Sequence, residues 1–183
     1  MTEIHSFAEI DASLRSIDTG EPATAKRRLF ASAARFQNRA VKPREWLVEG
    51  FIPNGTVTLL GGDGGSGKSL LAMMLAIATA STKDVRWLGR LPVQGPAIYC
   101  GAEDDIDEMH RRMADITDAN FIQFTDLERL HVCSLAGQDA LLAVENPKTK
   151  VLAATPLFAE IRDKIEAERP SLVVFDTLAD LFG

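Results

Sequence analysis

The sequence predicts an α/β fold in which a mostly parallel sheet carries helices on both faces. Short apolar strands alternate with helix-length segments along the chain, and strands that are joined through helices run parallel. The composition agrees, since 46% of the 183 residues are hydrophobic and 25% are charged, as in ordinary soluble domains. We therefore expect one globular domain over residues 41–183, preceded by a helical N-terminal arm over residues 1–40.

Two helical segments are expected in the N-terminal arm. The first, residues 1–20, carries four apolar residues at helical spacing. These are Phe7, Ile10, Leu14 and Ile17. The second, residues 23–40, is basic, and residues 21–50 together hold seven basic and three acidic side chains, a net charge of +4. A solvated helix face, an arm that docks on a neighbouring subunit and a contact with phosphate backbones each explain this charge, and the sequence does not separate them.

Four strands and three helices are expected in the globular domain. After a tight turn at Ile52–Gly55, the β-branched and apolar run Thr56–Leu60 fits a buried strand. The remaining expected elements, in chain order, are a helix from Lys68 to about Ser81 that is apolar nearly all round, a strand over 96–100, an acidic helix to about Ile116, a strand over 130–133, a polar loop over 136–154, a helix from Pro156 that ends before Pro170, and a strand over 171–175.

A glycine-rich loop between the first strand and the first helix carries the strongest functional signal. Its residues match the pattern G-x-x-x-x-G-K-(S/T) without a gap. They are Gly62, Asp63, Gly64, Gly65, Ser66, Gly67, Lys68 and Ser69. Glycines let backbone N–H groups curl around phosphates, and the following helix N-terminus adds partial positive charge. With Lys68 on the β- and γ-phosphates and the Ser69 hydroxyl on Mg²⁺, the sequence predicts a nucleoside triphosphate site.

Two acidic residues at strand ends complete the predicted site. An apolar strand delivers Asp176 to the edge of the sheet, which is the Walker B arrangement that holds Mg²⁺ through its water shell. Thr177 follows, where many ATPases carry the glutamate that activates water. We therefore expect Glu103, just beyond the second strand, to be the catalytic base, because parallel strands end at the same edge. Either Asp104 or Asp105 is expected to cap the next helix.

Four stretches together resemble AAA-family ATPases of the RepA type, which are RecA-like enzymes of phages, plasmids and bacterial chromosomes. They are residues 46–55, 61–69, 100–105 and 175–183. The resemblance spans residues 41–183 and implies a RecA-like P-loop NTPase fold, ATP and Mg²⁺ as ligands, and Glu103 as the base. It also implies a homo-oligomer, such as the hexameric ring of the best-known member, a plasmid replicative helicase. In such rings an arginine from the next subunit completes the site.

The resemblance also bears on where the sequence stops. In RecA-like sheets, as the resemblance implies, the strand after Walker B inserts between it and the phosphate-loop strand. The sequence stops at Gly183, seven residues after Asp176. We therefore expect an N-terminal fragment of a longer protein that has little ATPase activity alone. The arginine for the neighbouring subunit and the DNA-contacting loops are expected beyond residue 183.

The leading functional hypothesis is an oligomeric ATPase that acts on single-stranded DNA in replication or recombination of a mobile element, in the manner of a helicase. The alternative is an ATP-switched assembly or regulatory module that unwinds nothing. Stimulation of ATP turnover by single-stranded DNA distinguishes the two hypotheses.

Composition excludes other classes of function. The net charge of −6 argues against coating of nucleic acid, although it leaves room for a local basic groove. The longest apolar run, Leu70–Ala80, is too short to span a bilayer, and the N-terminus lacks a signal core. We therefore expect a cytoplasmic protein without membrane contact.

Cys100 and Cys133 lack C-x-x-C spacing and are expected to be reduced, buried thiols. The three histidines are scattered, so no metal besides Mg²⁺ is expected.

Overall fold

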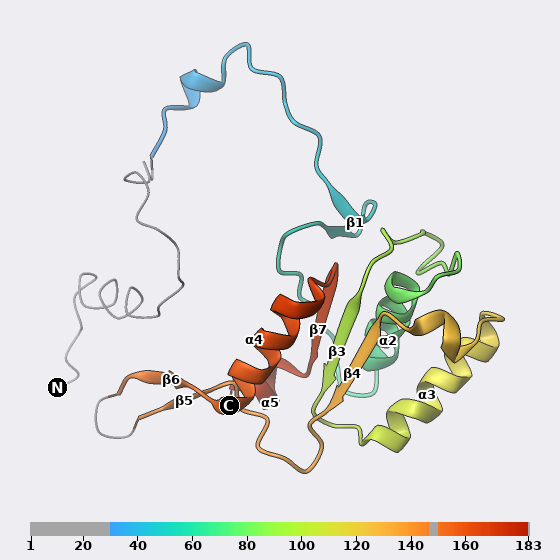
Figure 1. The fold of residues 1–183 in the computed structure, drawn as a ribbon. Coiled ribbons are helices and arrows are strands. Elements are labelled where there is room, and N and C mark those ends of the chain that lie inside the picture. The colour runs from blue at the N-terminus through green and yellow to red at the C-terminus, as the bar shows by residue number, and fades with distance from the viewer. Residues whose placement is uncertain (1–29, 147–149, 183) are drawn as a thin grey trace. The chain divides into compact units, whose positions relative to one another are not determined.

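A computed structural model describes residues 30–146 and 150–182 of the chain (Figure 1). The chain divides into two units, residues 1–43 and residues 44–183. In the described part of the first unit, the regular structure is one 3-10 helix, η1 (Ala33–Phe36), which the Ser32 side chain caps. The helix expected over 23–40 is therefore not formed over 30–40. Every residue there is exposed, and a short helix without packing is marginal in water. The helix expected over 1–20 lies outside the described residues.

A β-hairpin begins the second unit. β1 (Trp46–Val48) pairs antiparallel with β2 (Ile52–Pro53). The turn between them uses Gly50 at φ 78°, a left-handed value that glycine adopts without strain. The first two residues of the turn expected at Ile52–Gly55 therefore belong to strand β2. The hairpin is anchored to the core because Val48 and its neighbour Leu47 are buried.

The central sheet has three parallel strands within the described residues, in the order β4–β3–β7. β3 (Ala97–Gly101) lies between β4 (Leu130–Ser134) and β7 (Leu172–Asp176), and all five of its residues are buried. The register aligns Gly101 with Ser134 on one side and with Asp176 on the other. The carboxyl ends of the strands therefore meet at one edge of the sheet. This arrangement confirms the expected α/β architecture with a parallel sheet.

Helices cover both faces of this sheet (Figure 1). α2 (Lys68–Ala80) and α3 (Ile106–Ala119) pack on one face, while α4 (Pro156–Glu168) and the short α5 (Leu178–Phe182) pack on the other. Side chains of β3 alternate between the two cores. Ala97 and Tyr99 join the α2–α3 core, and Ile98 and Cys100 join the α4–α5 core. The C-terminal half of α2 is buried, as its apolar sequence predicts.

Two segments of the second unit differ from the sequence expectation. Residues 56–60 belong to no strand pairing in the part of the chain that the structure describes, and Val57 and Leu59 are 101% and 76% exposed. β-propensity alone does not make a strand, because the backbone N–H and C=O groups need a neighbouring strand. The loop expected over 136–154 contains a hairpin, in which β5 (Ala143–Glu145) pairs antiparallel with β6 (Leu152–Ala154).

A second 3-10 helix, η2 (Phe124–Leu127), precedes β4 and has a capping box in which Gln123 and Asp126 satisfy each other's backbone N–H groups. Among the described residues, no helix is both long enough and apolar enough to cross a membrane.

Candidate nucleotide-binding site

The glycine-rich loop leads from residues 56–60 directly into α2. Gly65 and Gly67 have φ values of 71° and 83°, which residues with a Cβ atom rarely adopt. Gly67 is the N-cap of α2, and no side chain of the described residues caps this helix. The first N–H groups of α2 therefore remain available for an anion, and the helix dipole favours negative charge there.

The backbone carbonyl of Asp63 organises this loop. It accepts hydrogen bonds from Lys68 Nζ and from Ser66 Oγ, each at 2.7 Å, and from the Ser66 N–H at 3.3 Å. Gly62 lies close to the Ser66 side chain, since a Cβ built on Gly62 would be 3.2 Å from Ser66 Oγ. Charged acceptors form stronger hydrogen bonds than neutral carbonyls, so a phosphate competes well for the Lys68 ammonium.

A pocket of about 710 Å³ opens between the loop and α3. Loop residues 64–69 form one wall and α3 forms another, while Glu103 and Thr177 line it from the ends of β3 and β7. Three residues of the predicted site, Gly62, Asp63 and Asp176, do not line the pocket. Asp63 and Asp176 are adjacent in sequence to the lining residues Gly64 and Thr177, and a Cβ built on Gly62 would be 3.2 Å from Ser66 Oγ of the lining. The structure thus brings the phosphate loop and the predicted base to one pocket, with Asp176 at its margin.

Asp176 is held in place by a residue that sequence reasoning missed. Tyr99 Oη donates a hydrogen bond to Asp176 Oδ2 at 2.7 Å and lies 3.5 Å from the Ser69 carbonyl oxygen. Tyr99 is 1% exposed, and its burial, followed by the hydrogen bond to Asp176, raises the pKa of Tyr99 far above its usual range. The phenol therefore stays protonated and remains a donor. It ties the end of β7 to the first turn of α2.

A sequence signal for Tyr99 does exist. It is the only tyrosine of the chain, and it stands in an apolar strand two positions before Gly101, near the strand end. Because side chains alternate along a strand, Tyr99 points to the opposite face of the sheet from Ile98 and Cys100. That face is the one on which α2 packs.

The three consecutive acidic residues after β3 have different roles. Asp105 is the N-cap of α3, and its Oδ1 accepts the Glu108 N–H at 2.7 Å. Asp104, expected as another candidate cap, instead pairs with Arg112 at 2.5 Å. Burial raises the pKa of Asp104, and the Arg112 guanidinium opposes that shift. Within the described part of the chain, Glu103 has no hydrogen bond or ion pair, and it is exposed at the pocket. Its carboxylate therefore reaches the pocket without a protein partner among the described residues.

Arg112 is a second residue of the pocket that the sequence motifs do not identify. It lines the pocket from α3, and besides Asp104 it contacts Glu108, with Arg112 Nε 3.0 Å from Glu108 Oε1. These two carboxylates hold its guanidinium at the wall facing the phosphate loop. The Glu108–Arg112 spacing of four residues along one helix is a signal that the sequence does contain.

The donor atoms at the pocket margin suit Mg²⁺. Mg²⁺ prefers oxygen ligands and retains several waters, so it needs few protein groups beside the phosphates of a nucleotide. The Ser69 hydroxyl and the Asp176 carboxylate are such donors, and Tyr99 contacts both of these residues.

A parallel sheet with helices on both faces, a glycine loop that opens a helix, and acidic residues at the same sheet edge define a P-loop NTPase domain. The comparison with protein families agrees, since residues 21–183 match the family model described as an AAA domain. The match covers most of the chain. The chain therefore belongs to the AAA domain family and is an AAA-type P-loop ATPase domain.

Proposed function

We propose that this domain binds ATP together with Mg²⁺ and hydrolyses it with Glu103 as the general base. The observation that carries the proposal is one pocket that contains the phosphate loop, the exposed Glu103 carboxylate and the residue after Asp176. The N–H groups at the start of α2 and the Lys68 ammonium bind the β- and γ-phosphates. Ser69 and Asp176 hold Mg²⁺, which supplies charge neutralisation to the phosphates.

Each of the chain's own groups has a defined task in this reaction. Lys68 exchanges its bond to the Asp63 carbonyl for phosphate oxygens and stabilises the charge that moves onto them. Glu103 accepts the proton of the attacking water, and its exposed position leaves room for that water. Tyr99 keeps the Asp176 carboxylate oriented. Arg112 forms an ion pair with Asp104, so its guanidinium does not pair with Glu103.

The role of the hydrolysis follows from the motif set. We infer that the domain works in a homo-oligomer, such as a hexameric ring, as a RepA-type motor on single-stranded DNA during replication or recombination. The proposal of a RepA-type motor is supported by four stretches that together resemble RepA-type ATPases, residues 46–55, 61–69, 100–105 and 175–183. An ATP-switched assembly module is the competing outcome.

The experiment uses the full-length protein and compares wild type with Glu103→Gln and with Asp107→Asn, a nearby exposed carboxylate of α3 outside the pocket. Calorimetry with Mg²⁺ and ATP should show similar affinity for all three proteins. Single-turnover hydrolysis should fall by about 10²–10⁴-fold in Glu103→Gln only, the usual effect of losing a general base. Near wild-type hydrolysis in Glu103→Gln would show that another group is the base.

Single-stranded DNA is then added to the wild-type reaction. Faster turnover and ATP-dependent assembly support the motor. Assembly that responds to ATP but not to DNA supports the switch. A wild-type protein that binds no ATP contradicts the proposal as a whole.

A further inference from the structure

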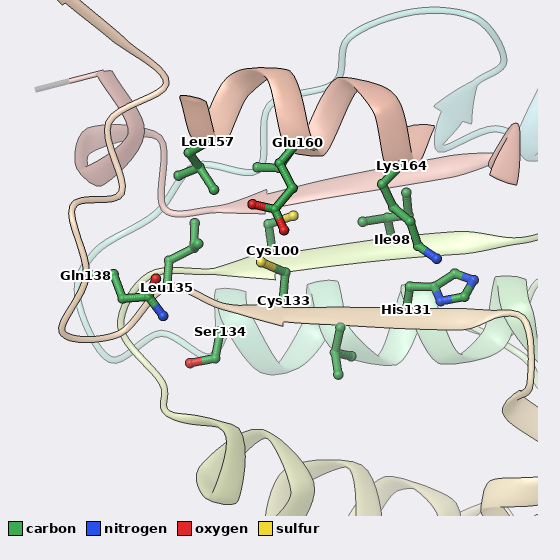
Figure 2. A pocket seen from close by; sticks show the side chains of 12 residues that line it. Ile98, Cys100, His131, Cys133, Ser134, Leu135, Gln138, Leu157, Glu160 and Lys164 are labelled. Atoms are coloured by element: carbon green, nitrogen blue, oxygen red, sulfur yellow. The ribbon is translucent and has the colours of Figure 1, made fainter. Parts of the chain in front are cut away.

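A second pocket lies on the face of the sheet opposite the phosphate loop. It has a volume of about 550 Å³ and is enclosed by β3, β4 and α4 (Figure 2). Leu157 and Ile161 of α4 contribute apolar walls, and both cysteines of the chain, Cys100 and Cys133, line it. The proposed ATPase reaction uses none of these groups.

The two cysteines are direct neighbours across the sheet. The register of β3 and β4 pairs Cys100 with Cys133, and both are free thiols. Figure 2 shows both cysteine side chains on the face of the sheet that α4 covers, beneath the Glu160 side chain. Adjacent strands lie about 4.7–4.9 Å apart. This spacing falls within the range of about 4.4–6.8 Å between the Cα atoms of a disulfide. The backbone spacing of the two strands is therefore compatible with a disulfide between the two cysteines.

The environments of the two thiols differ. Cys100 is 1% exposed, whereas Cys133 is half-buried. The neighbouring Cys100 side chain lowers the pKa of Cys133, although burial and the Glu160 carboxylate oppose this shift. The Cys133 side chain, together with burial, raises the pKa of Cys100. Since the thiolate is the nucleophile, Cys133 is the reactive member of the pair and Cys100 supports it.

We propose that Cys133 and Cys100 form a peroxide-sensitive thiol site on the α4 face of the sheet. The Cys133 thiolate attacks one oxygen of a hydroperoxide, the O–O bond breaks, and the departing hydroxide or alkoxide takes up a proton. Cys133 becomes a sulfenic acid. Cys100 then attacks that sulfur, the S–OH bond breaks, and hydroxide leaves as water with the Cys100 proton. The two sulfurs lose two electrons in total, and the peroxide gains them.

The test uses the full chain, which has these two cysteines and no others. The protein is treated with hydrogen peroxide at pH 7, quenched, and analysed by intact mass and thiol count. Wild type should lose both thiols and the mass of two hydrogen atoms as a monomer. Cys100→Ser should accumulate a sulfenic acid that dimedone traps at Cys133. Cys133→Ser should keep Cys100 reduced over the same period.

The reference is the same chain unfolded in urea, where cysteines have a pKa of about 8.5. A lowered pKa raises the thiolate fraction of Cys133 at pH 7, and the lower nucleophilicity of a more acidic thiol offsets part of this gain. We expect oxidation in the folded protein to be faster than in urea. This wild-type comparison requires no variant to fold.

A charge variant adds a matched control. Glu160→Gln removes the carboxylate that faces Cys133 and should speed oxidation up to about twofold, whereas Glu166→Gln, outside the pocket on the same helix, should have no effect. Oxidation no faster than in urea, loss of Cys100 at an unchanged rate in Cys133→Ser, or disulfides between chains would each overturn the proposal.

Discussion

Replacing Tyr99 with phenylalanine isolates the hydrogen bond that orients Asp176. The ring keeps its packing among Ala97 and the α2–α3 core, and only the hydroxyl is removed. A hydrogen bond to a charged group contributes about 1.5–3 kcal/mol, and less where water can replace it. Asp176 is half-buried and gains water when the phenol is lost. We therefore expect Tyr99→Phe to lower the free energy of unfolding by about 1–2 kcal/mol.

Tyr99→Phe should reduce the affinity for Mg²⁺ by more than this loss of stability suggests. Removing a group that orients a metal ligand typically reduces metal affinity by about 10–100-fold. Since Asp176 is one of several oxygen donors, we expect a loss of about 10-fold for Mg²⁺ in the presence of a non-hydrolysable ATP analogue. Mn²⁺ is a paramagnetic substitute that binds similar oxygen ligands, so its affinity can be read by electron paramagnetic resonance without any turnover.

The control is Ile161→Val, which lies in the α4–α5 core on the opposite face of the sheet. This change should cost about 0.5–1.5 kcal/mol of stability and should leave Mn²⁺ affinity unchanged. If Tyr99→Phe also leaves Mn²⁺ affinity unchanged at a similar loss of stability, the hydroxyl has a purely structural role and our reasoning about Asp176 is refuted.

Three other substitutions or conditions test the site. Lys68→Ala should abolish most ATP affinity in calorimetry while circular dichroism stays unchanged, because the buried half of α2 holds that region; ordinary affinity would contradict the phosphate-loop assignment. Arg112→Ala should destabilise the fold by about 1–2 kcal/mol, since it leaves the largely buried Asp104 unpaired. Arg111→Ala, which removes a single exposed ion pair, should have little effect in the same denaturant titration. At alkaline pH, the unfolded state releases the Tyr99 proton from about pH 10 upward while the folded state retains it, so stability should fall by up to about 1.4 kcal/mol per pH unit above pH 10; Tyr99→Phe should remove this slope.

The features that sequence predicted well are encoded locally. The glycines, Lys68 and Ser69 are contiguous, and their conformational freedom and charge act within one loop and one helix turn. Strands β3, β4 and β7 are apolar runs bounded by polar segments, so their existence and parallel direction follow from alternation with helices. The positions of Glu103 and of the end of β7 at one pocket follow from the shared edge of those strands.

The features that sequence missed depend on contacts between distant segments. Residues 56–60 have strand-like side chains, yet pairing requires a partner that propensity does not specify. The bond from Tyr99 to Asp176 joins positions 77 residues apart, and it becomes visible only when β3 and β7 are in register. The pairing of Cys100 with Cys133 also depends on the register of β3 and β4, because a shift of one residue between these strands would turn one thiol to the opposite face of the sheet.

The exposed residues 57–60 affect how any measurement on this protein is designed. β7 pairs with β3 alone among the described residues, so one of its edges is open, and Val57 and Leu59 add accessible apolar surface. Open strand edges are templates for pairing between chains. Protein concentration is therefore an experimental variable in its own right. A functional ring has a fixed stoichiometry and responds to nucleotide, whereas edge-to-edge association grows with concentration and ignores nucleotide. A dilution series with and without ATP separates the two before any rate is interpreted.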